Sequence, residues 1–367
     1  MREHIAYWLG LRRVPGLGPR RFRNLLEFFG SAEKIWQAQE KELAQVPGLG
    51  PQLQKNLLEC RARLDLDKEV ERIKRCGVKV VTWEDESYPL ALRNIYDPPP
   101  ILFVKGDLPA EMQAVAIVGT RRPTPYGKTV ARELARQLSS AGWWVISGLA
   151  RGIDSCAHQG ALECSGKTVA VLGCGIDVVY PRENLSLYRQ IEKTGALVTE
   201  FPLGTPPEAG NFPARNRIIS ALARGVVVVE AAESSGALIT ANFALEQGRD
   251  VFAVPGPITS RLSRGPHSLL KEGAKLVENA GDILEEYGIE WEEAEKADRR
   301  KKNEEAPPDF SEAERSIMGQ LSLEPVAAEE LTAKTGLSAA EVNASLALLE
   351  IKGKVKKLPG GWYILNL

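Results

Sequence analysis

The chain has 367 residues, of which 44% are hydrophobic, and its 47 Lys and Arg against 48 Asp and Glu give a net charge of −1. This composition indicates a globular protein of two or three domains, and it excludes one that holds nucleic acid by bulk positive charge. Because no apolar run reaches the roughly 20 residues that span a bilayer and no signal-peptide pattern opens the chain, we expect a cytoplasmic protein without a membrane span.

The first 65 residues contain a repeated hairpin sequence. Val-Pro-Gly-Leu-Gly-Pro at 14–19 recurs at 46–51, and a segment with helical periodicity follows each copy. A Gly-x-Gly hairpin that opens a helix directs backbone N–H groups outward, as in the helix-hairpin-helix motif of DNA-binding proteins, which the repeat resembles. Residues 1–65 are therefore expected to form a helical, helix-hairpin-helix or SAM-like domain, with DNA contact and a purely architectural role both open.

Residues 66–113 are expected to be a connector. Its Asp-Pro-Pro-Pro sequence at 97–100 is a stiff break, and 101–106 has the pattern of a short strand that ends in a turn.

From residue 114 to residue 288 the patterns of strands and helices alternate. The expected strands are 114–118, 143–146, 168–172, 196–200, 226–230, 250–254 and 275–277, and the expected helices are 128–141, 155–163, 216–223, 237–247 and 267–272. Near-continuous Val, Ile and Leu runs separated by helices are typical of a parallel sheet that is covered on both faces. The sequence thus predicts an α/β domain, a Rossmann-like doubly wound parallel sheet.

The remaining chain divides into a linker and a small module. Residues 289–310 hold five basic and eight acidic residues without periodicity, as in a flexible charged linker. Residues 311–367 show three helical segments and then a hairpin pattern, the order of a winged helix. Because its third helical segment, 339–351, has no basic residue, we expect this winged-helix-like domain to contact protein or to pack, and not to read DNA.

Three loops that follow expected strands combine glycine with arginine or asparagine, at 118–122, 146–154 and 212–217. Glycine lets a backbone approach a ligand closely, helix N-termini offer unpaired N–H groups, and the arginine fork matches phosphate oxygens. Ligands of open α/β sheets bind at the carboxyl edge, where these loops meet. Arg121, Arg122, Lys128 and Arg182 are expected to form an electropositive track along that edge.

These loops do not predict a cofactor or a catalytic centre. A dinucleotide site needs Gly-x-Gly-x-x-Gly and a later ribose-binding acid, whereas residues 119–127 hold two arginines and two prolines where the pyrophosphate would lie. Five cysteines without a Cys-x-x-Cys pair and three scattered histidines suggest neither a disulfide framework nor a metal site. Asp154 and His158, four residues apart on an expected helix, are one candidate acid–base pair, but an acid in the first turn more often serves the helix dipole.

Five motifs in one order then carry a family resemblance, at 116–121, 146–154, 212–219, 235–240 and 248–256. They resemble the signature of the DNA-processing protein A (DprA or Smf) family. The resemblance implies a bacterial cytosolic protein that binds single-stranded DNA, protects it, and loads the RecA recombinase in natural transformation, without enzymatic activity. Together with the loops it marks these candidate DNA contacts: Gly119, Arg121, Arg122, Lys128, Ser147, Gly148, Arg151, Arg182, Arg215, Asn216 and Arg217.

Few aromatic residues stand near these loops: Tyr126, Tyr180, Phe201 and Phe212. We therefore expect recognition to rest mainly on phosphates with one pocketed base, so that affinity falls steeply with salt and the changes Arg121→Ala and Arg217→Ala each flatten the slope.

The resemblance also implies a homodimer formed through the Rossmann-like domain. The last expected strand with its helix is an apolar edge that suits pairing, and its candidate interface residues are His267, Leu269, Leu270 and Leu276.

The competing hypothesis is an enzyme, a nucleotide-processing hydrolase of the lysine-decarboxylase-like Rossmann group. Such hydrolases carry a Pro-Gly-Gly-x-Gly-Thr loop before a catalytic glutamate. The corresponding stretch at 232–240 lacks the two adjacent glycines, which counts against that hypothesis.

Overall fold

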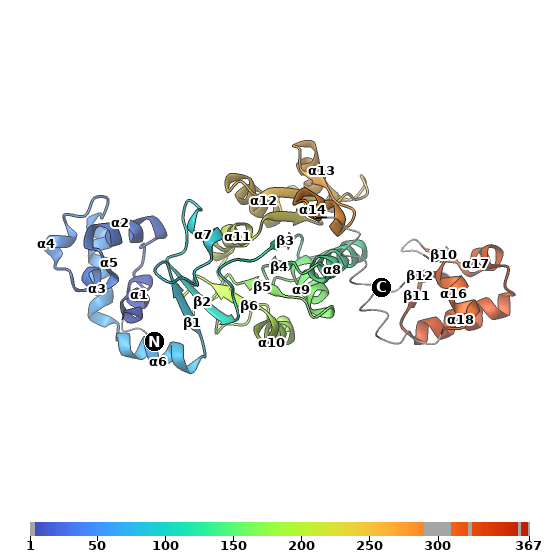
Figure 1. Cartoon of the computed structure of the whole chain (residues 1–367), viewed down its shortest axis with the longest axis horizontal. Coiled ribbons are helices and arrows are strands. Elements are labelled where there is room, and N and C mark those ends of the chain that lie inside the picture. The colour runs from blue at the N-terminus through green and yellow to red at the C-terminus, as the bar shows by residue number, and fades with distance from the viewer. Residues whose placement is uncertain (1–3, 290–309, 322–324, 359–360, 366–367) are drawn as a thin grey trace. The chain divides into compact units, whose positions relative to one another are not determined.

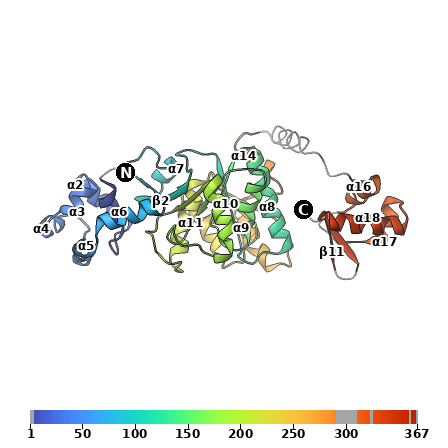
Figure 2. The ribbon, with the colours of Figure 1, turned by 90° about the horizontal axis from the view of Figure 1, so that it is seen from below.

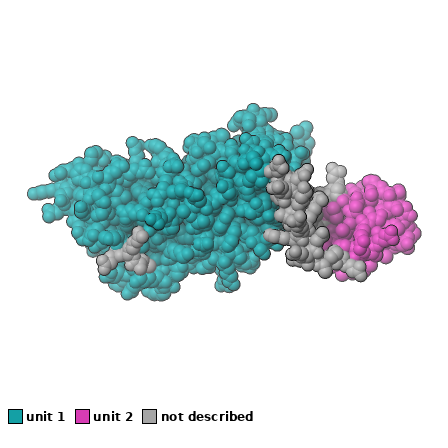
Figure 3. All heavy atoms as spheres, in the orientation of Figure 1, with its two compact units in different colours: residues 1–291 teal, residues 292–367 magenta. Residues whose placement is uncertain are grey.

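The computed structural model describes residues 4–289, 310–321, 325–358 and 361–365. The chain divides into two compact units, Met1–Trp291 and Glu292–Leu367 (Figures 1 and 3). The linker predicted at 289–310 lies outside the described residues, apart from its first and last residue.

The first unit begins with a helical layer. Its helices are α1 (Ile5–Arg12), α2 (Pro19–Phe29), α3 (Ala32–Gln37), α4 (Glu40–Leu43), α5 (Pro51–Arg63) and α6 (Leu66–Arg75). The two hairpin copies precede α2 and α5, where each glycine N-cap is followed by proline at the first helical position, which needs no N–H partner. Gly16 and Gly48 turn the two hairpins with φ of 82° and 79°, a region that strongly favours glycine. The structure thus confirms the repeated hairpin-to-helix arrangement.

A nine-stranded sheet forms the centre of the described part of the first unit, in the order β1-β2-β6-β5-β4-β3-β7-β8-β9. Its strands are β1 (Lys79–Thr82), β2 (Ile101–Gly106), β3 (Ala114–Val118), β4 (Trp144–Ser147), β5 (Thr168–Val171), β6 (Ala196–Thr199), β7 (Gly225–Val228), β8 (Asp250–Ala253) and β9 (Lys275–Leu276). From β6 to β9 all neighbours pair in parallel, as the sequence predicted. The direction of winding reverses between β3 and β7, so the switch point lies at their carboxyl ends.

Residues 66–113, which the sequence predicts to be a connector, are instead part of the folded unit. This segment contains α6, and its strands β1 and β2 extend the same sheet, because β2 pairs antiparallel with β6 and buries its first four residues. The helical layer also shares one hydrophobic core with the sheet, in which Trp8 and Phe22 lie with Ile73, Phe103 and Leu197. Residues 1–65 are therefore part of the same compact unit as the sheet.

Helices cover both faces of the sheet. They are α7 (Leu90–Arg93), α8 (Pro125–Ser140), α9 (Ile153–Glu163), α10 (Leu185–Thr194), α11 (Asn211–Leu222), α12 (Gly236–Glu246), α13 (Arg264–Lys271) and α14 (Ala280–Glu286). Helices α8, α9 and α10 pack side by side on one face, as the view from below shows (Figure 2). Helices α7, α11 and α12 pack together and share a core with the opposite side of the strands. Among the described helices, none combines the length and the apolarity that a bilayer crossing requires.

The second unit has the winged-helix order. It contains α16 (Glu312–Met318), β10 (Val326–Ala327), α17 (Ala328–Thr335), α18 (Ala339–Ile351), β11 (Val355–Leu358) and β12 (Trp362–Leu365), with the strands in the antiparallel order β10-β12-β11. Capping boxes that begin at Ser311 and Ser338 start α16 and α18. Ile317, Leu331 and Leu346 lie in its own small core. The predicted three helices and hairpin are confirmed.

Candidate nucleic-acid interface

A pocket of about 380 Å³ opens at the switch point of the sheet. Its walls come from the end of β3 and the loop after it (118–122), from residues 212–219 of α11 and from the start of α12 (235–240), with Ala150 and Asp154 behind them. Parallel strands bring these segments together because their carboxyl ends lie at one edge. Of the eleven predicted contacts, the pocket gathers Gly119, Arg121, Arg122, Arg215 and Asn216.

The rim of the pocket combines a cation with aromatic rings. The guanidinium of Arg121 lies 5.0 Å from the centroid of the Phe212 ring, and the Tyr180 ring lies 5.8 Å from the same ring. Such an arrangement offers a flat, positively charged surface of the kind on which bases stack. Phe212 is one of the few aromatic residues near the loops, but it is not among the predicted contacts. Local sequence patterns do not reveal that it contacts Arg121, 91 positions earlier.

Arg215 is a buried member of the pocket wall. Its Nη1 donates to the carbonyl oxygens of Gly148 and Val171, the former at 2.6 Å. Asp154 supports the same loop, because its Oδ2 accepts from the N–H groups of Gly148 and Ala150 at 3.1 and 3.3 Å. Burial lowers the pKa of Arg215 and raises the pKa of Asp154, and each of the two charges opposes the shift of the other. The pair fixes the loop after β4 at the back of the pocket.

Two helix N-termini at this edge differ in what they already bind. At the start of α8, Glu230 accepts from the N–H and the hydroxyl of Thr124 at 2.9 and 2.5 Å, so a carboxylate already occupies that positive helix end. The start of α12 is capped only by its own Ser235 hydroxyl and forms part of the pocket wall. A phosphate therefore fits the N-terminus of α12 better than that of α8.

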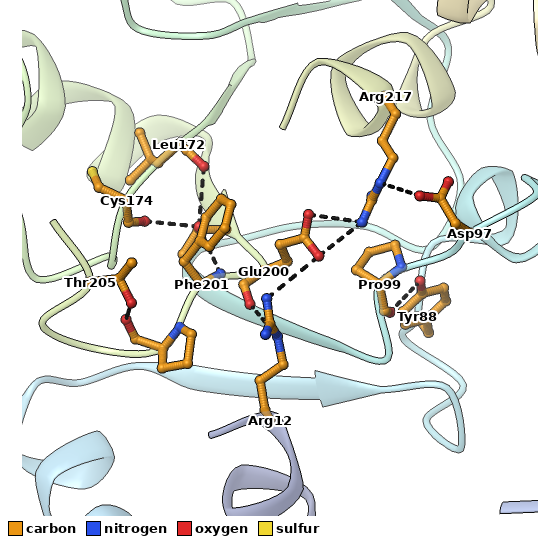
Figure 4. A network of polar contacts seen from close by, with 12 residues as sticks. Arg12, Tyr88, Asp97, Pro99, Leu172, Cys174, Glu200, Phe201, Thr205 and Arg217 are labelled. Atoms are coloured by element: carbon orange, nitrogen blue, oxygen red, sulfur yellow. Dashed lines mark hydrogen bonds and ion pairs between the residues drawn. The ribbon is translucent and has the colours of Figure 1, made fainter. Parts of the chain in front are cut away.

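The prediction that Arg217 contacts DNA is corrected, because this side chain lies in a buried ion-pair network (Figure 4). The segment that was expected to be a loop is helical from Asn211 onward, so residues 215 and 217 point to nearly opposite sides of α11. Arg217 Nη2 donates to both oxygens of Glu200, and its Nε lies 2.9 Å from Oδ2 of Asp97. Arg12 of α1 donates from Nε to the Glu200 carbonyl at 2.9 Å. We withdraw Arg217 from the candidate contacts.

The remaining predicted contacts lie outside the pocket. Ser147 is fully buried and donates its hydroxyl to the Ile117 carbonyl at 2.7 Å, so its side chain is structural and is also withdrawn. Gly148 is buried against the Arg215 guanidinium, which leaves no room for a Cβ. Lys128, Arg151 and Arg182 are exposed, and Arg151 is paired with Glu183 at 2.5 Å. They are consistent with a track beside the pocket and not with its interior.

The candidate dimer residues are also partly withdrawn. Leu269 is 4% exposed and belongs to the unit's own core, and His267 Nε2 lies 3.0 Å from the Gly256 carbonyl. Leu270 packs half-buried against that core, whereas Leu276 on the edge strand β9 is 45% exposed. Leu276 is therefore the residue of this set that stays free for a partner.

Asp154 and His158 do not form an acid–base pair. Oδ2 of Asp154 accepts hydrogen bonds from the backbone N–H groups of Gly148 and Ala150. His158 is fully buried, and its Nδ1 lies 2.7 Å from Thr168 Oγ1. Burial lowers the pKa of His158 to about 3. Across the described residues, no group of three or more His, Cys, Asp or Glu side chains is arranged to hold a metal ion.

The fold and this site define a Rossmann-like protein with a cationic, aromatic-edged pocket at its switch point. Family models match the sheet domain, the winged-helix unit and the N-terminal helices separately. Residues 79–288 match the family described as DNA recombination-mediator protein A, residues 301–361 the DprA winged helix domain, and residues 9–61 a SAM-like helix-hairpin-helix tandem. The chain belongs to the DNA recombination-mediator protein A family.

Individual relatives support this membership over nearly the whole chain. Protein Smf of Synechocystis is 34% identical over 98% of both chains, and Protein Smf of Escherichia coli is 42% identical over 76% of this chain and 75% of its own. The structure of DNA processing protein A from Streptococcus pneumoniae superposes with a TM-score of 0.68 at 37% identity, covering 77% of this chain and 97% of that one. A structure described as showing the single-stranded DNA binding mode of DNA processing protein A from Helicobacter pylori has a TM-score of 0.52 at 32% identity, covering 57% and 95%.

Proposed function

We propose that the protein binds single-stranded DNA with its switch-point pocket, protects it, and loads a RecA-type recombinase onto it in transformation or recombination. The observation that carries the proposal is the Arg121–Phe212 pair, which stands beside the open N-terminus of α12 in one pocket. This pair combines the two contacts that a single strand offers, a phosphate and an unstacked base.

The dimensions of the pocket favour a single strand over a duplex. Its volume of about 380 Å³ lies in the range of small-ligand sites, roughly 300–1,000 Å³. A base can enter such a recess only when it is unpaired and free to leave its stack, which is the state of single strands. Arg121 and Arg122 are exposed at the mouth of the pocket, where they would meet the backbone on both sides of that base.

Further parts of the proposal rest on family membership. Recombinase loading agrees with the description of the family as recombination mediators, and the H. pylori relative is described as binding single-stranded DNA, the state that the protein would protect. Because the proposed partner is DNA, we place the protein in the cytoplasm. We also propose a homodimer that pairs at the β9 edge, where Leu276 remains exposed.

Binding is better supported than hydrolysis. The alternative nucleotide hydrolase would need an acid that is free to activate water in the pocket. Asp154 is the acid in the pocket wall, and its Oδ2 holds two backbone N–H groups of the loop after β4.

The test is a salt-titrated binding assay of the whole protein with matched single-stranded and double-stranded oligonucleotides. We expect preferential binding of single strands, with affinity that falls steeply as salt rises. Arg121→Ala should weaken binding roughly 10- to 100-fold and lower the salt slope by about one. Arg189→Ala removes an exposed arginine of α10 outside the pocket and is the matched control. Equal affinity for duplex, or an unchanged slope in Arg121→Ala, would overturn the proposal.

A further inference from the structure

We infer that the ring of Tyr96, held by Arg20 of the helical layer, is a second stacking site for single-stranded nucleic acid, separate from the switch-point pocket. The inference rests on the proposed function, since it extends the path of the same strand. It gives the helix-hairpin-helix layer a direct part in binding, a question that the sequence left open.

Tyr96 is the most exposed aromatic side chain of the described residues. It is 81% exposed, whereas the next, Phe28, is 46% exposed. A ring of this size that lies in water offers a large apolar face to a base. Its hydroxyl is nevertheless held, because Arg20 Nη1 lies 3.1 Å from Tyr96 Oη. This hydrogen bond links the ring to the helical layer.

The backbone that follows the ring is fixed. The next residue, Asp97, is bound by Arg217 at 2.9 Å, and the prolines that follow it are buried. Tyr88 donates its hydroxyl to the Pro99 carbonyl at 2.8 Å, which ties this segment to the sheet (Figure 4). A rigid platform loses little conformational entropy when a base stacks on it.

The surroundings of Tyr96 carry positive charge. Arg20, which donates to the Tyr96 hydroxyl, is exposed on α2. Arg93 is exposed at the end of α7, three residues before Tyr96, and also donates to the Trp83 and Asp85 carbonyls. The negative charge of its neighbour Asp97 is offset by Arg217. Arginines that alternate with an exposed ring are the pattern with which proteins follow a single-stranded backbone and stack its bases.

The platform lies at the same edge of the sheet as the pocket. Strand β2 runs antiparallel to β6, with Phe103 opposite Thr199, so the segment that enters β2 lies where β6 ends, at the carboxyl edge. Helix α11 joins the two places, because its Arg215 forms part of the pocket wall while its Arg217 binds Asp97. In Figure 1, α7 stands next to α11, against which it packs. A strand that leaves the pocket therefore reaches Tyr96 by crossing α11.

The decisive experiment compares two oligothymidylates, one of about 4 and one of about 16 nucleotides, the limits of site sizes for single-strand-binding folds. The short one fills the pocket, and the long one also reaches the platform. Tyr96→Ala should weaken binding of the long oligonucleotide by about 5- to 150-fold, the effect of one lost stacking contact, and leave the short one unchanged. Tyr96→Phe should keep most of the affinity because the ring remains. Phe28→Ala, an exposed aromatic at the other end of α2, is the control.

A second readout locates the contact directly. Photo-cross-linking with 5-iododeoxyuridine placed along the long oligonucleotide should join a base to Tyr96 in the wild-type protein and lose that adduct in Tyr96→Ala. Unchanged affinity of Tyr96→Ala for the long oligonucleotide, or an equal loss for both lengths, would overturn the inference. Arg121→Ala separates the two proposals: it should weaken both lengths, and if it weakens neither, the pocket assignment fails whatever Tyr96 does.

Discussion

Arg217 and Glu200 form a buried two-bond ion pair, in which Nη2 of the arginine lies 2.8 and 2.9 Å from the two carboxylate oxygens. Their side chains are only 6% and 5% exposed. Arg12 adds a second cation 3.7 Å from the same carboxylate, and burial lowers the pKa of Arg12, an effect that Glu200 opposes. This network joins α1, the end of β6 and α11, and thereby attaches the helical layer to the sheet (Figure 4).

The first prediction concerns Arg217→Met. Because Glu200 would stay buried with one partner fewer, we expect the free energy of unfolding to fall by about 3–5 kcal/mol. The salt slope of DNA binding should not change, since Arg217 does not reach the surface. Chemical denaturation and salt-titrated binding measure the two quantities, with Arg189→Met as the exposed control. A stable variant with a reduced slope would return Arg217 to the DNA contacts.

The second prediction concerns Gly148→Ala. A Cβ at this position would overlap the guanidinium of Arg215, which is itself fixed by the Gly148 and Val171 carbonyls. We expect a loss of about 1–3 kcal/mol in stability, the usual cost of overpacking, and weaker binding of single strands because the pocket wall shifts. Gly210→Ala is the matched control, since a Cβ at that position, outside the pocket wall, meets nothing within 4 Å. Equal affinities for the two variants would contradict this account of Gly148.

The third prediction separates stacking from charge. Phe212→Ala removes the ring under Arg121 without removing a charge. Binding of single strands should therefore weaken by about 1–3 kcal/mol while the salt slope stays the same. Phe212→Trp should retain affinity, because the larger ring offers the same stacking face. A slope that falls in Phe212→Ala as it does in Arg121→Ala would mean that the ring acts only by positioning the arginine.

The fourth prediction concerns stability at acid pH. Thr168 donates its hydroxyl to the Val145 carbonyl, so it can only accept from His158 Nδ1–H, and Nε2 lies buried without a hydrogen-bond partner among the described residues. The folded-state pKa of His158, about 3, is below the ordinary 6.5. The unfolded chain therefore binds the extra proton first, and stability is complete above pH 6.5 and falls as pH decreases toward 3.

The loss attributable to this histidine is at most about 1.4 kcal/mol per pH unit. Unfolding measured at pH 7 and pH 5 should show a smaller difference in His158→Gln than in the wild type. His4→Gln, which changes an exposed histidine, should keep the wild-type difference. If His158→Gln keeps it as well, the acid sensitivity comes from other groups.

Local patterns were sufficient for the elements of the parallel sheet and of the second unit. The Val-rich runs at β3 and β7 predicted strands to within a residue or two, because apolar content and period are properties of the segment itself. The same patterns missed β1 and α10, whose short or mixed sequences gave no clear period. They also did not predict that β2 belongs to the sheet, because its partner β6 lies more than ninety residues further along the chain.

The sequence by itself determined that the glycine and arginine loops would meet, because parallel strands place their carboxyl ends at one edge. Which side chains enter the pocket was decided only by the tertiary structure. Helix α11 begins at Asn211 and not near residue 216, and this phase turns Arg215 into the pocket and Arg217 toward Glu200. Likewise, the pairings of Arg121 with Phe212 and of Arg20 with Tyr96 join residues 91 and 76 positions apart. Composition and period describe a segment, whereas such contacts depend on how distant segments are brought together by the complete fold.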